Sequence, residues 1–208
     1  MAFKKPSDYD SAKSFGQGGF KSLSKGGYIC RVLKAEEKND RNGKPMIHIA
    51  FDIIDGEFTG HFMNLYQSRK KASDDPMNVK FPFEGQMWIP IYDYNDANKT
   101  SSKFKGFCTA LEDSGTQVWS PSNDFLMQNI KDAEIGIVFQ NQESEYNGKT
   151  SWRAVPWGCR SVEAIESGDY FVPDDKPLPQ EQNTGFNNFS TPNPNLDSFA
   201  QAEDDLPF

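Results

Sequence analysis

The sequence feature that most constrains the fold is a pair of strand-like segments joined by an Asn-Gly dipeptide. Residues 133–146 and 149–161 are rich in β-branched and aromatic side chains, and Asn147-Gly148 lies between them. Asn and Gly tolerate the positive φ angles that a two-residue type I′ turn requires. We therefore predict a long antiparallel hairpin. Because Pro156 lacks a backbone N–H, it needs a sheet edge or a bulge.

Two segments nearer the N-terminus also predict strands. Residues 28–37 are the first, and a turn-forming stretch, NDRNGKP, separates them from residues 46–55. The second segment alternates strictly between apolar and other side chains, which is typical of a strand with one buried face. The predicted buried residues of that face are Ile47, Ile49, Phe51 and Ile53.

The segments between the second strand and the helix are harder to assign. Asp55-Gly56 predicts a tight turn into a third strand over residues 57–66, antiparallel to the second. Gly60 in the middle of that strand indicates a bulge or a sharp bend. Residues 67–100 contain many turn formers and are expected to be an insertion with one extra hairpin.

One amphipathic helix is predicted before the final hairpin. Apolar side chains recur at helical spacing behind Ser and Thr residues that can cap the helix; they are Phe104, Phe107, Cys108 and Leu111. The element order β-β-β-α-β-β is that of the OB-fold, an oligonucleotide-binding five-stranded Greek-key barrel. We therefore predict an all-β domain with one helix at residues 27–173, behind an N-terminal arm at residues 1–26.

Residues 174–208 differ in composition from the rest of the chain. They contain seven acidic residues and one Lys, a net charge of −6 out of −8 for the whole chain, with many Pro, Asn and Gln residues. This composition predicts a disordered acidic tail. Apolar residues at the tip of such a tail suit a pocket on a partner protein. The predicted protein-interaction residues are Glu203, Asp204, Asp205, Leu206, Pro207 and Phe208.

The sequence offers little for catalysis. It has two histidines and three widely spaced cysteines, without a C-x-x-C pair or a run with metal-ligand spacing. Paired acidic residues lie in turns, without an apolar pocket to shift their pKa values. We therefore expect a protein that is not an enzyme and needs no cofactor and no metal. The absence of a long apolar segment predicts a soluble cytoplasmic protein with no membrane partner.

Binding of single-stranded nucleic acid needs cations along the phosphates and aromatic rings for the bases. Both kinds of side chain occur together on the final hairpin, and cations follow the first strand and the loop after it. For any one ring, burial in the core explains its presence equally well. The grouping counts for more, because the loops after strand 1 and between strands 4 and 5 of an OB-fold flank its binding face. The predicted nucleic-acid-binding residues are Arg31, Lys34, Arg41, Lys44, Tyr146, Lys149, Trp152, Arg153, Trp157 and Arg160.

Two parts of the chain resemble known proteins. The ending EDDLPF resembles the C-terminal tip of bacterial single-stranded DNA-binding proteins, whose acidic tail recruits replication and repair enzymes. Residues 27–173 resemble a family of phage and prophage proteins often encoded beside replication genes. This likeness lies in GGYICRVLKAEE, GEFTGHF and EYNGKTSWRAVPWGCRSVEAI and in a Gly-Asp-Tyr segment at residues 168–170. The N-terminal arm and the insertion depart from ordinary bacterial single-strand binders, which leaves homo-oligomeric assembly open.

The resemblance implies a protein that binds and protects single-stranded DNA during phage or mobile-element replication and recombination in a bacterial cytoplasm. Its tip is then expected to recruit a helicase, primase, polymerase or recombinase. One alternative is a replication or recombination adaptor that binds mainly protein partners. Another alternative is a metal-dependent nuclease, and RNA is not excluded as a ligand because stacking on rings does not test for a 2′-hydroxyl.

Overall fold

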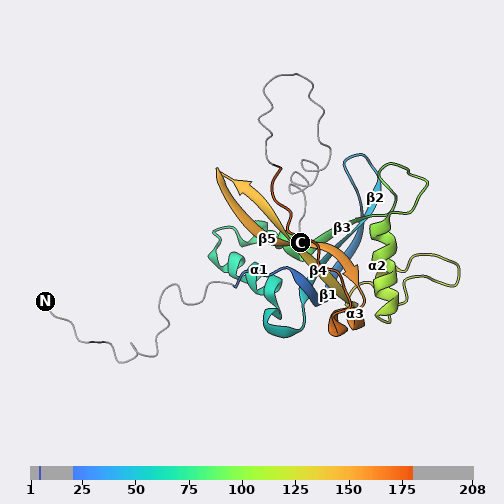
Figure 1. Cartoon of the computed structure of the whole chain (residues 1–208), viewed down its shortest axis with the longest axis horizontal. Coiled ribbons are helices and arrows are strands. Elements are labelled where there is room, and N and C mark those ends of the chain that lie inside the picture. Colours follow the sequence, from blue (N-terminus) through green and yellow to red (C-terminus); the bar gives the residue numbers. More distant parts are fainter. Residues whose placement is uncertain (1–4, 6–20, 180–208) are drawn as a thin grey trace, which may run out of the picture.

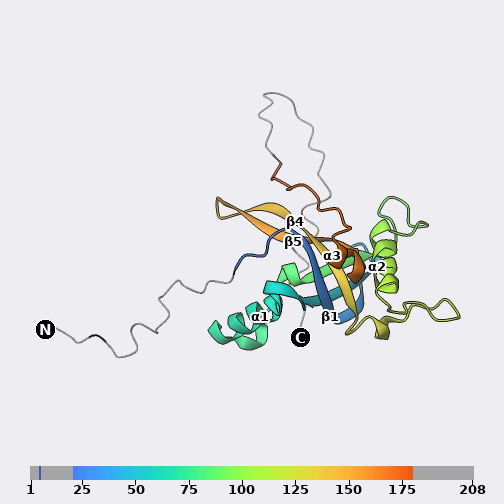
Figure 2. The ribbon, with the colours of Figure 1, turned by 60° about the horizontal axis from the view of Figure 1, so that its bottom comes forward.

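The computed structural model describes Lys5 and residues 21–179, which include one five-stranded antiparallel sheet. The strand order is β3-β2-β1-β4-β5, and Figures 1 and 2 show α1 and α2 on opposite sides of the molecule with the sheet between them. The strands are β1 (Gly26–Asn39), β2 (Pro45–Ile53), β3 (Gln86–Pro90), β4 (Glu134–Tyr146) and β5 (Lys149–Arg160). The helices are α1 (His61–Ala72), α2 (Ser102–Asp113) and α3 (Val162–Ser167).

The predicted hairpin is confirmed as β4 and β5. Asn147 and Gly148 have φ angles of 52° and 72°, as a type I′ turn requires. The register shifts between Val138 and Phe139, where Pro156 lies opposite Phe139. Because β5 is an edge strand with a bulge at this point, it accommodates the missing N–H of Pro156.

The first two strands and the helix at α2 are also confirmed, but β2 is not buried on one face only. Its predicted core residues are at most 1% exposed, and the opposite face of the same strand is buried as well. On that second face His48 stacks on Trp88 of β3, with ring centroids 4.9 Å apart. The alternation correctly predicted the strand. Its prediction of one exposed face was wrong, because long side chains of neighbouring strands cover that face.

The predicted third strand at residues 57–66 is wrong. A 3-10 turn, η1 (Gly56–Phe58), leads into α1, and Gly60 adopts a left-handed conformation just before that helix instead of forming a bulge. The buried Asp52 carboxylate at the end of β2 accepts hydrogen bonds from the backbone N–H groups of Phe62 and Met63, 2.9 and 3.1 Å away. These bonds satisfy N–H groups that the first turn of a helix leaves free, so they stabilise α1 at this place.

The third strand of the sheet is β3, which lies within the predicted insertion. It pairs antiparallel with β2, with Trp88 opposite His48. The order β-β-β-α-β-β is therefore present once α1 is taken as an insert between β2 and β3. His61 consequently begins α1 and does not face His48 across a strand pair. The short helix α3 was not predicted.

The sheet is curled so that its two edge strands approach each other. Cys159 Sγ of β5 lies 4.0 Å from Met87 Sδ of β3, and Arg153 Nη1 of β5 lies 3.4 Å from Glu84 Oε1, in the 3-10 turn η3 (Phe83–Gly85) before β3. Hydrogen-bonded pairing between β3 and β5 is absent from the sheet as described, so it is not closed into a barrel. The predicted OB-fold is thus supported only as a five-stranded antiparallel sheet with few helices.

Two of the short motifs quoted above meet at the start of β1. The Gly27 N–H donates to Tyr170 Oη over 3.1 Å. A Cβ atom added to Gly27 would lie 2.6 Å from the Tyr170 ring, so the close approach requires glycine. These contacts between Gly27, in the motif GGYICRVLKAEE, and Tyr170, in the Gly-Asp-Tyr segment, therefore hold the C-terminal end of the domain against β1.

The last described residues run along the part of β4 that lies beyond its pairing with the start of β1. Lys176 N–H donates to Asn141 O over 2.8 Å, and Lys176 O accepts from Glu143 N–H over 2.9 Å, in a parallel bridge. Lys25 Nζ also lies 2.6 Å from an Asp175 carboxylate oxygen. The expected tail, which begins at residue 174, therefore starts beside the β4–β5 hairpin. No helix in the part of the chain described here is long and apolar enough to cross a bilayer.

Candidate nucleic-acid interface

The outer half of the β4–β5 hairpin presents three exposed residues among those predicted to bind. Tyr146 and Lys149 flank the Asn-Gly turn, and the Tyr146 side chain is 80% exposed. Trp152 is 48% exposed and lies opposite Glu143. Because strands hold these residues while solvent reaches them, their rings are available for stacking.

The inner half of β5 holds its predicted residues through contacts within the chain. Arg153 pairs with Glu84, and Trp157 meets the Phe171 ring at a centroid distance of 6.1 Å. Arg160 Nη1 donates to the Cys159 carbonyl over 2.7 Å. Trp157 remains 38% exposed, whereas Arg160 is turned back onto its own strand.

The predicted residues of β1 and its following loop are spread over the length of the strand. Arg31 pairs with Glu134 at 2.7 Å near the start of β1, where Val32 and Lys34 flank a register shift. Lys44 donates to Tyr94 O over 3.0 Å at the other end, and Arg41 is exposed in the turn before β2. The structure does not bring all ten predicted residues together, since Arg31 and Lys44 lie near opposite ends of β1.

Residues that were not predicted connect the hairpin to β1. Partners directly opposite in antiparallel strands share a face of the sheet. The register places three such rows across β1, β2 and β3, namely Lys34–Ala50–Gln86, Glu36–His48–Trp88 and Lys38–Met46–Pro90. We call this surface the three-strand face. The short apolar run of Met87, Trp88 and Ile89 is a signal that could have identified β3 from the sequence.

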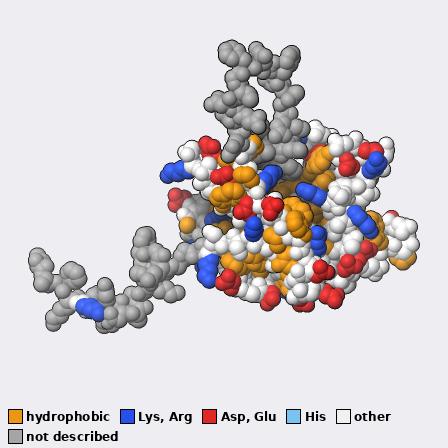
Figure 3. Space-filling model, viewed as in Figure 1, with side chains coloured by type: hydrophobic (Ala, Val, Ile, Leu, Met, Phe, Trp, Pro, Cys, Tyr) orange, Lys and Arg blue, Asp and Glu red, His pale blue; other side chains and the backbone are white. Residues whose placement is uncertain are grey.

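A column of stacked rings crosses the three-strand face. Phe83 stacks on Trp88 with centroids 5.3 Å apart and planes 26° from parallel, and Trp88 stacks on His48 in the same way. Glu84, the residue after Phe83, receives Arg153 from the hairpin. The partly exposed Phe83 and Trp88 therefore lie between the hairpin and the lysines of β1. Figure 3 shows hydrophobic patches with Lys, Arg, Asp and Glu side chains around them on one face of the molecule.

Glu36 is the electrostatic centre of the three-strand face. Its Oε1 atom lies 2.8 Å from Lys38 Nζ and 3.0 Å from His48 Nδ1, and its Oε2 atom lies 3.1 Å from Lys34 Nζ. Burial raises the pKa of the Glu36 carboxyl, but contacts with Lys38, His48 and Lys34 outweigh burial and lower this pKa to about 2. Glu36 is therefore ionised at neutral pH. It pairs with Lys34, one of the predicted binding residues, and with Lys38, whose Nζ atom is buried.

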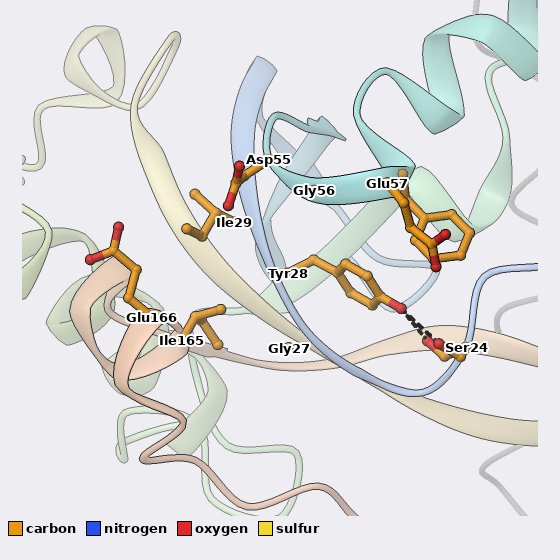
Figure 4. A pocket seen from close by; sticks show the side chains of 10 residues that line it. Ser24, Gly27, Tyr28, Ile29, Asp55, Gly56, Glu57, Ile165 and Glu166 are labelled. Carbon is orange, nitrogen blue, oxygen red and sulfur yellow. Dashed lines mark hydrogen bonds between the residues drawn. The ribbon is translucent and has the colours of Figure 1, made fainter.

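A pocket of about 410 Å³ lies elsewhere, between the start of β1, the loop before α1 and helix α3. Figure 4 shows Tyr28, Ile29 and Ile165 along it, and Asp55, Glu57 and Glu166 around them. Tyr28 Oη donates to the Ser24 carbonyl over 2.9 Å. Three carboxylates beside this pocket disfavour a phosphate backbone, so the pocket is not part of the candidate interface.

The predicted protein-interaction tip, residues 203–208, lies outside the described residues. The described part also contains no group of three or more His, Cys, Asp or Glu side chains arranged to hold a metal ion. The candidate site is thus made of aromatic rings, lysines and arginines.

Comparison with protein families gives a match to the N-terminal part of the chain. Residues 7–80 match a family described as a protein of unknown function (DUF669). The matched segment includes β1, β2 and α1, together with residues before β1. The search of curated proteins found no match. The chain is therefore similar over about a third of its length to a family whose description names no activity.

Proposed function

We propose that this chain binds and protects single-stranded DNA. The observation that carries the proposal is the grouping of exposed rings and cations on the hairpin, together with its contact with the three-strand face. Tyr146, Lys149 and Arg153 share one face of the hairpin, and Trp152 lies on the other. Arg153 reaches Glu84, next to the stacked rings of Phe83 and Trp88. Each ring that stacks a base contributes about 1–3 kcal/mol, and the cations attract the phosphates. Such binding needs no catalytic group.

We also propose that the sheet is a partly open OB-fold. In the order β3-β2-β1-β4-β5, closure needs β3 to pair with β5, and these two edges already approach through Met87 and Cys159. Helix α2 lies between the third and fourth strands of the chain, as the helix does in the predicted order. The OB-fold is a partly open five-stranded Greek-key barrel that binds oligonucleotides on the face of its second and third strands and on adjoining loops. This proposal agrees with a role for the three-strand face.

The acidic C-terminal residues extend the proposal to partners. The tip at residues 203–208 is proposed to recruit replication and recombination enzymes, in the replication of a phage or mobile element. The described start of this acidic segment runs along β4 at Lys176, beside the hairpin. Removal of residues 180–208 should therefore tighten DNA binding at low salt and abolish recruitment.

Tryptophan fluorescence tests DNA binding directly. The chain has four tryptophans, of which Trp88, Trp152 and Trp157 lie on the proposed interface. Trp119 packs against Phe104 and Phe125 beside α2 and serves as the internal comparison. We expect a dT oligonucleotide to quench the emission with an affinity that falls as salt rises. Absence of quenching at low salt would contradict the proposal.

A protein adaptor is the second candidate function, and the pocket beside Tyr28 favours it. Its three carboxylates suit a cationic side chain of a protein partner better than they suit DNA. Charge reversal of Glu57 and Glu166 to Lys separates the two functions. An adaptor would lose its protein partner while oligonucleotide binding, if present, would be unchanged or stronger.

A further inference from the structure

His48 is fully buried between two oxygen atoms that both accept hydrogen bonds. Gln86 Nε2 donates to the carbonyls of Phe81 and Pro82 over 3.0 and 3.3 Å, which turns Gln86 Oε1 toward His48 Nε2 at 2.8 Å. The other ring nitrogen, Nδ1, faces Glu36 Oε1 at 3.0 Å. A neutral imidazole has one N–H and satisfies only one of these oxygens, whereas an imidazolium satisfies both.

The charged groups that face His48 all come from β1. They are Glu36, Lys38 and Lys34, while β3 contributes the uncharged Gln86 and Trp88. Neighbours on the same face of β2, Met46 and Ala50, are uncharged. One carboxylate therefore faces three cationic or potentially cationic groups, and Lys38 and His48 share the same oxygen of Glu36.

We propose that Lys34 forms a subsite for a backbone phosphate of single-stranded DNA, and that a proton on His48 controls it. This inference rests on the function proposed above. When His48 carries the proton, its imidazolium takes up a share of the Glu36 charge, so Lys34, whose side chain is 37% exposed, is released for the phosphate. When His48 is neutral, the Glu36 carboxylate holds Lys34. Lys38, whose Nζ atom is buried, contributes only to the charge around Glu36. His48 is thus a positioning residue that acts through Glu36 and need not touch DNA.

The sign of the pH dependence follows from these charges. The cluster of Lys34, Lys38, Glu36 and His48 carries +2 when His48 is protonated and +1 when it is neutral. Burial lowers the pKa of His48, and the contacts with Glu36 and Gln86 partly oppose this. DNA affinity should therefore rise as pH falls through the pKa of His48. By linkage, bound DNA should raise that pKa.

The first test examines the imidazole of the full-length protein without DNA. Nitrogen-15 NMR of the two histidines distinguishes neutral tautomers from the imidazolium, and His61 is the comparison residue. We expect His48 to become protonated only below the ordinary histidine pKa of 6.5, because burial lowers its pKa, and to show both nitrogens protonated at the acidic end. A ring that stays neutral at pH 5, in a protein whose amide spectrum remains folded, would overturn the proposal whether or not DNA binds.

The second test measures the affinity for a dT oligonucleotide at pH 5.5 and 8.0, at one ionic strength. A pKa change of half a unit to one unit on binding predicts about three- to tenfold tighter binding at pH 5.5. Glu36→Gln removes the group through which His48 acts, so it should tighten binding at pH 8.0 and abolish the pH effect. Lys34→Gln should weaken binding more at pH 5.5 than at pH 8.0.

His61→Gln is the matched control and should keep the pH effect. If His48→Gln remains folded by amide NMR, it should bind with the weaker affinity at both pH values. Equal pH dependence in the wild type and Glu36→Gln would overturn the proposal. Failure of the wild type to bind DNA at either pH would remove the proposed function and with it the phosphate subsite, while the imidazole titration would still report the proton on His48.

Discussion

The β4–β5 hairpin and the three-strand face both carry aromatic rings beside cations, but they hold these groups in different ways. On the hairpin, Tyr146 and Trp152 are exposed. On the three-strand face, Trp88 is stacked between Phe83 and His48, and Lys34 and Lys38 are paired with Glu36. Rings on the hairpin can therefore be changed at little cost to the fold, whereas rings on the three-strand face contribute to stability.

The largest expected difference between the two regions is in stability. Trp88→Ala should lower the free energy of unfolding by about 2–3 kcal/mol, because it removes a ring stacked on a buried imidazole and leaves a cavity. Trp152→Ala should lower it by less than about 0.5 kcal/mol, since the side chain is largely exposed. Urea unfolding followed by circular dichroism measures both values. Equal losses in the two variants would refute the distinction between the regions.

DNA binding should give the next largest effect. Trp152→Ala should weaken binding of a dT oligonucleotide by about 1–3 kcal/mol, which corresponds to roughly 5- to 150-fold. Trp119→Phe, away from the interface, should bind as the wild type does. Fluorescence anisotropy of a labelled oligonucleotide measures these affinities. A wild-type affinity in Trp152→Ala would show that the hairpin ring does not stack a base.

Acid should weaken the three-strand face through Glu36. The pKa of Glu36 is lowered from 4.5 to about 2 in the folded protein, so its stabilising contribution is present above pH 4.5 and is lost as pH falls toward 2. A shift of this size corresponds to at most about 3 kcal/mol, and the partial exposure of the side chain reduces it to about 1–2 kcal/mol.

Glu36→Gln should therefore be less stable than the wild type at pH 6, by about 1–2 kcal/mol, and nearly equal to it at pH 2.5. Urea unfolding at the two pH values measures the difference. Glu112→Gln, at an exposed position of α2, should show no such pH-dependent gap. A constant gap between Glu36→Gln and the wild type would mean that the ion pairs around Glu36 do not stabilise the fold.

The elements that could be predicted from the sequence are those specified by local patterns. The Asn147-Gly148 turn, the alternation of β2 and the helical spacing of Phe104 and Leu111 each identified their element. Helix α1 could not be predicted in this way, since the Asp52 carboxylate that receives its first N–H groups comes from the preceding strand. The Asp55-Gly56 turn and Gly60 therefore favoured a strand over residues 57–66, although the hydrogen bond from Phe62 N–H to Asp52, ten residues earlier, stabilises a helix.

In the candidate site too, the residues grouped by local sequence could be predicted, and those grouped by strand pairing could not. Trp152 and Arg153 could be predicted because the hairpin places rings and cations near one another in the sequence. Trp88 and His48 could not, because they are 40 residues apart and meet only through the register of β2 and β3. The pairing of Lys34 with Glu36 was missed for a different reason. Lys34 was considered only as a cation for DNA, whereas residues two apart on a strand share a face and can pair with each other.

The smallest expected effect compares two arginines that each pair with a glutamate. Arg153 lies between the hairpin and the three-strand face with Glu84, while Arg31 pairs with Glu134 near the start of β1. If DNA passes from the hairpin to Phe83 and Trp88, Arg153→Gln should weaken binding by about two- to threefold and reduce the slope of log affinity against log salt by about one. Arg31→Gln should change neither. An equal loss in both variants would mean that DNA also contacts the beginning of β1, and a loss in Arg31→Gln alone would move the path of the strand away from the hairpin.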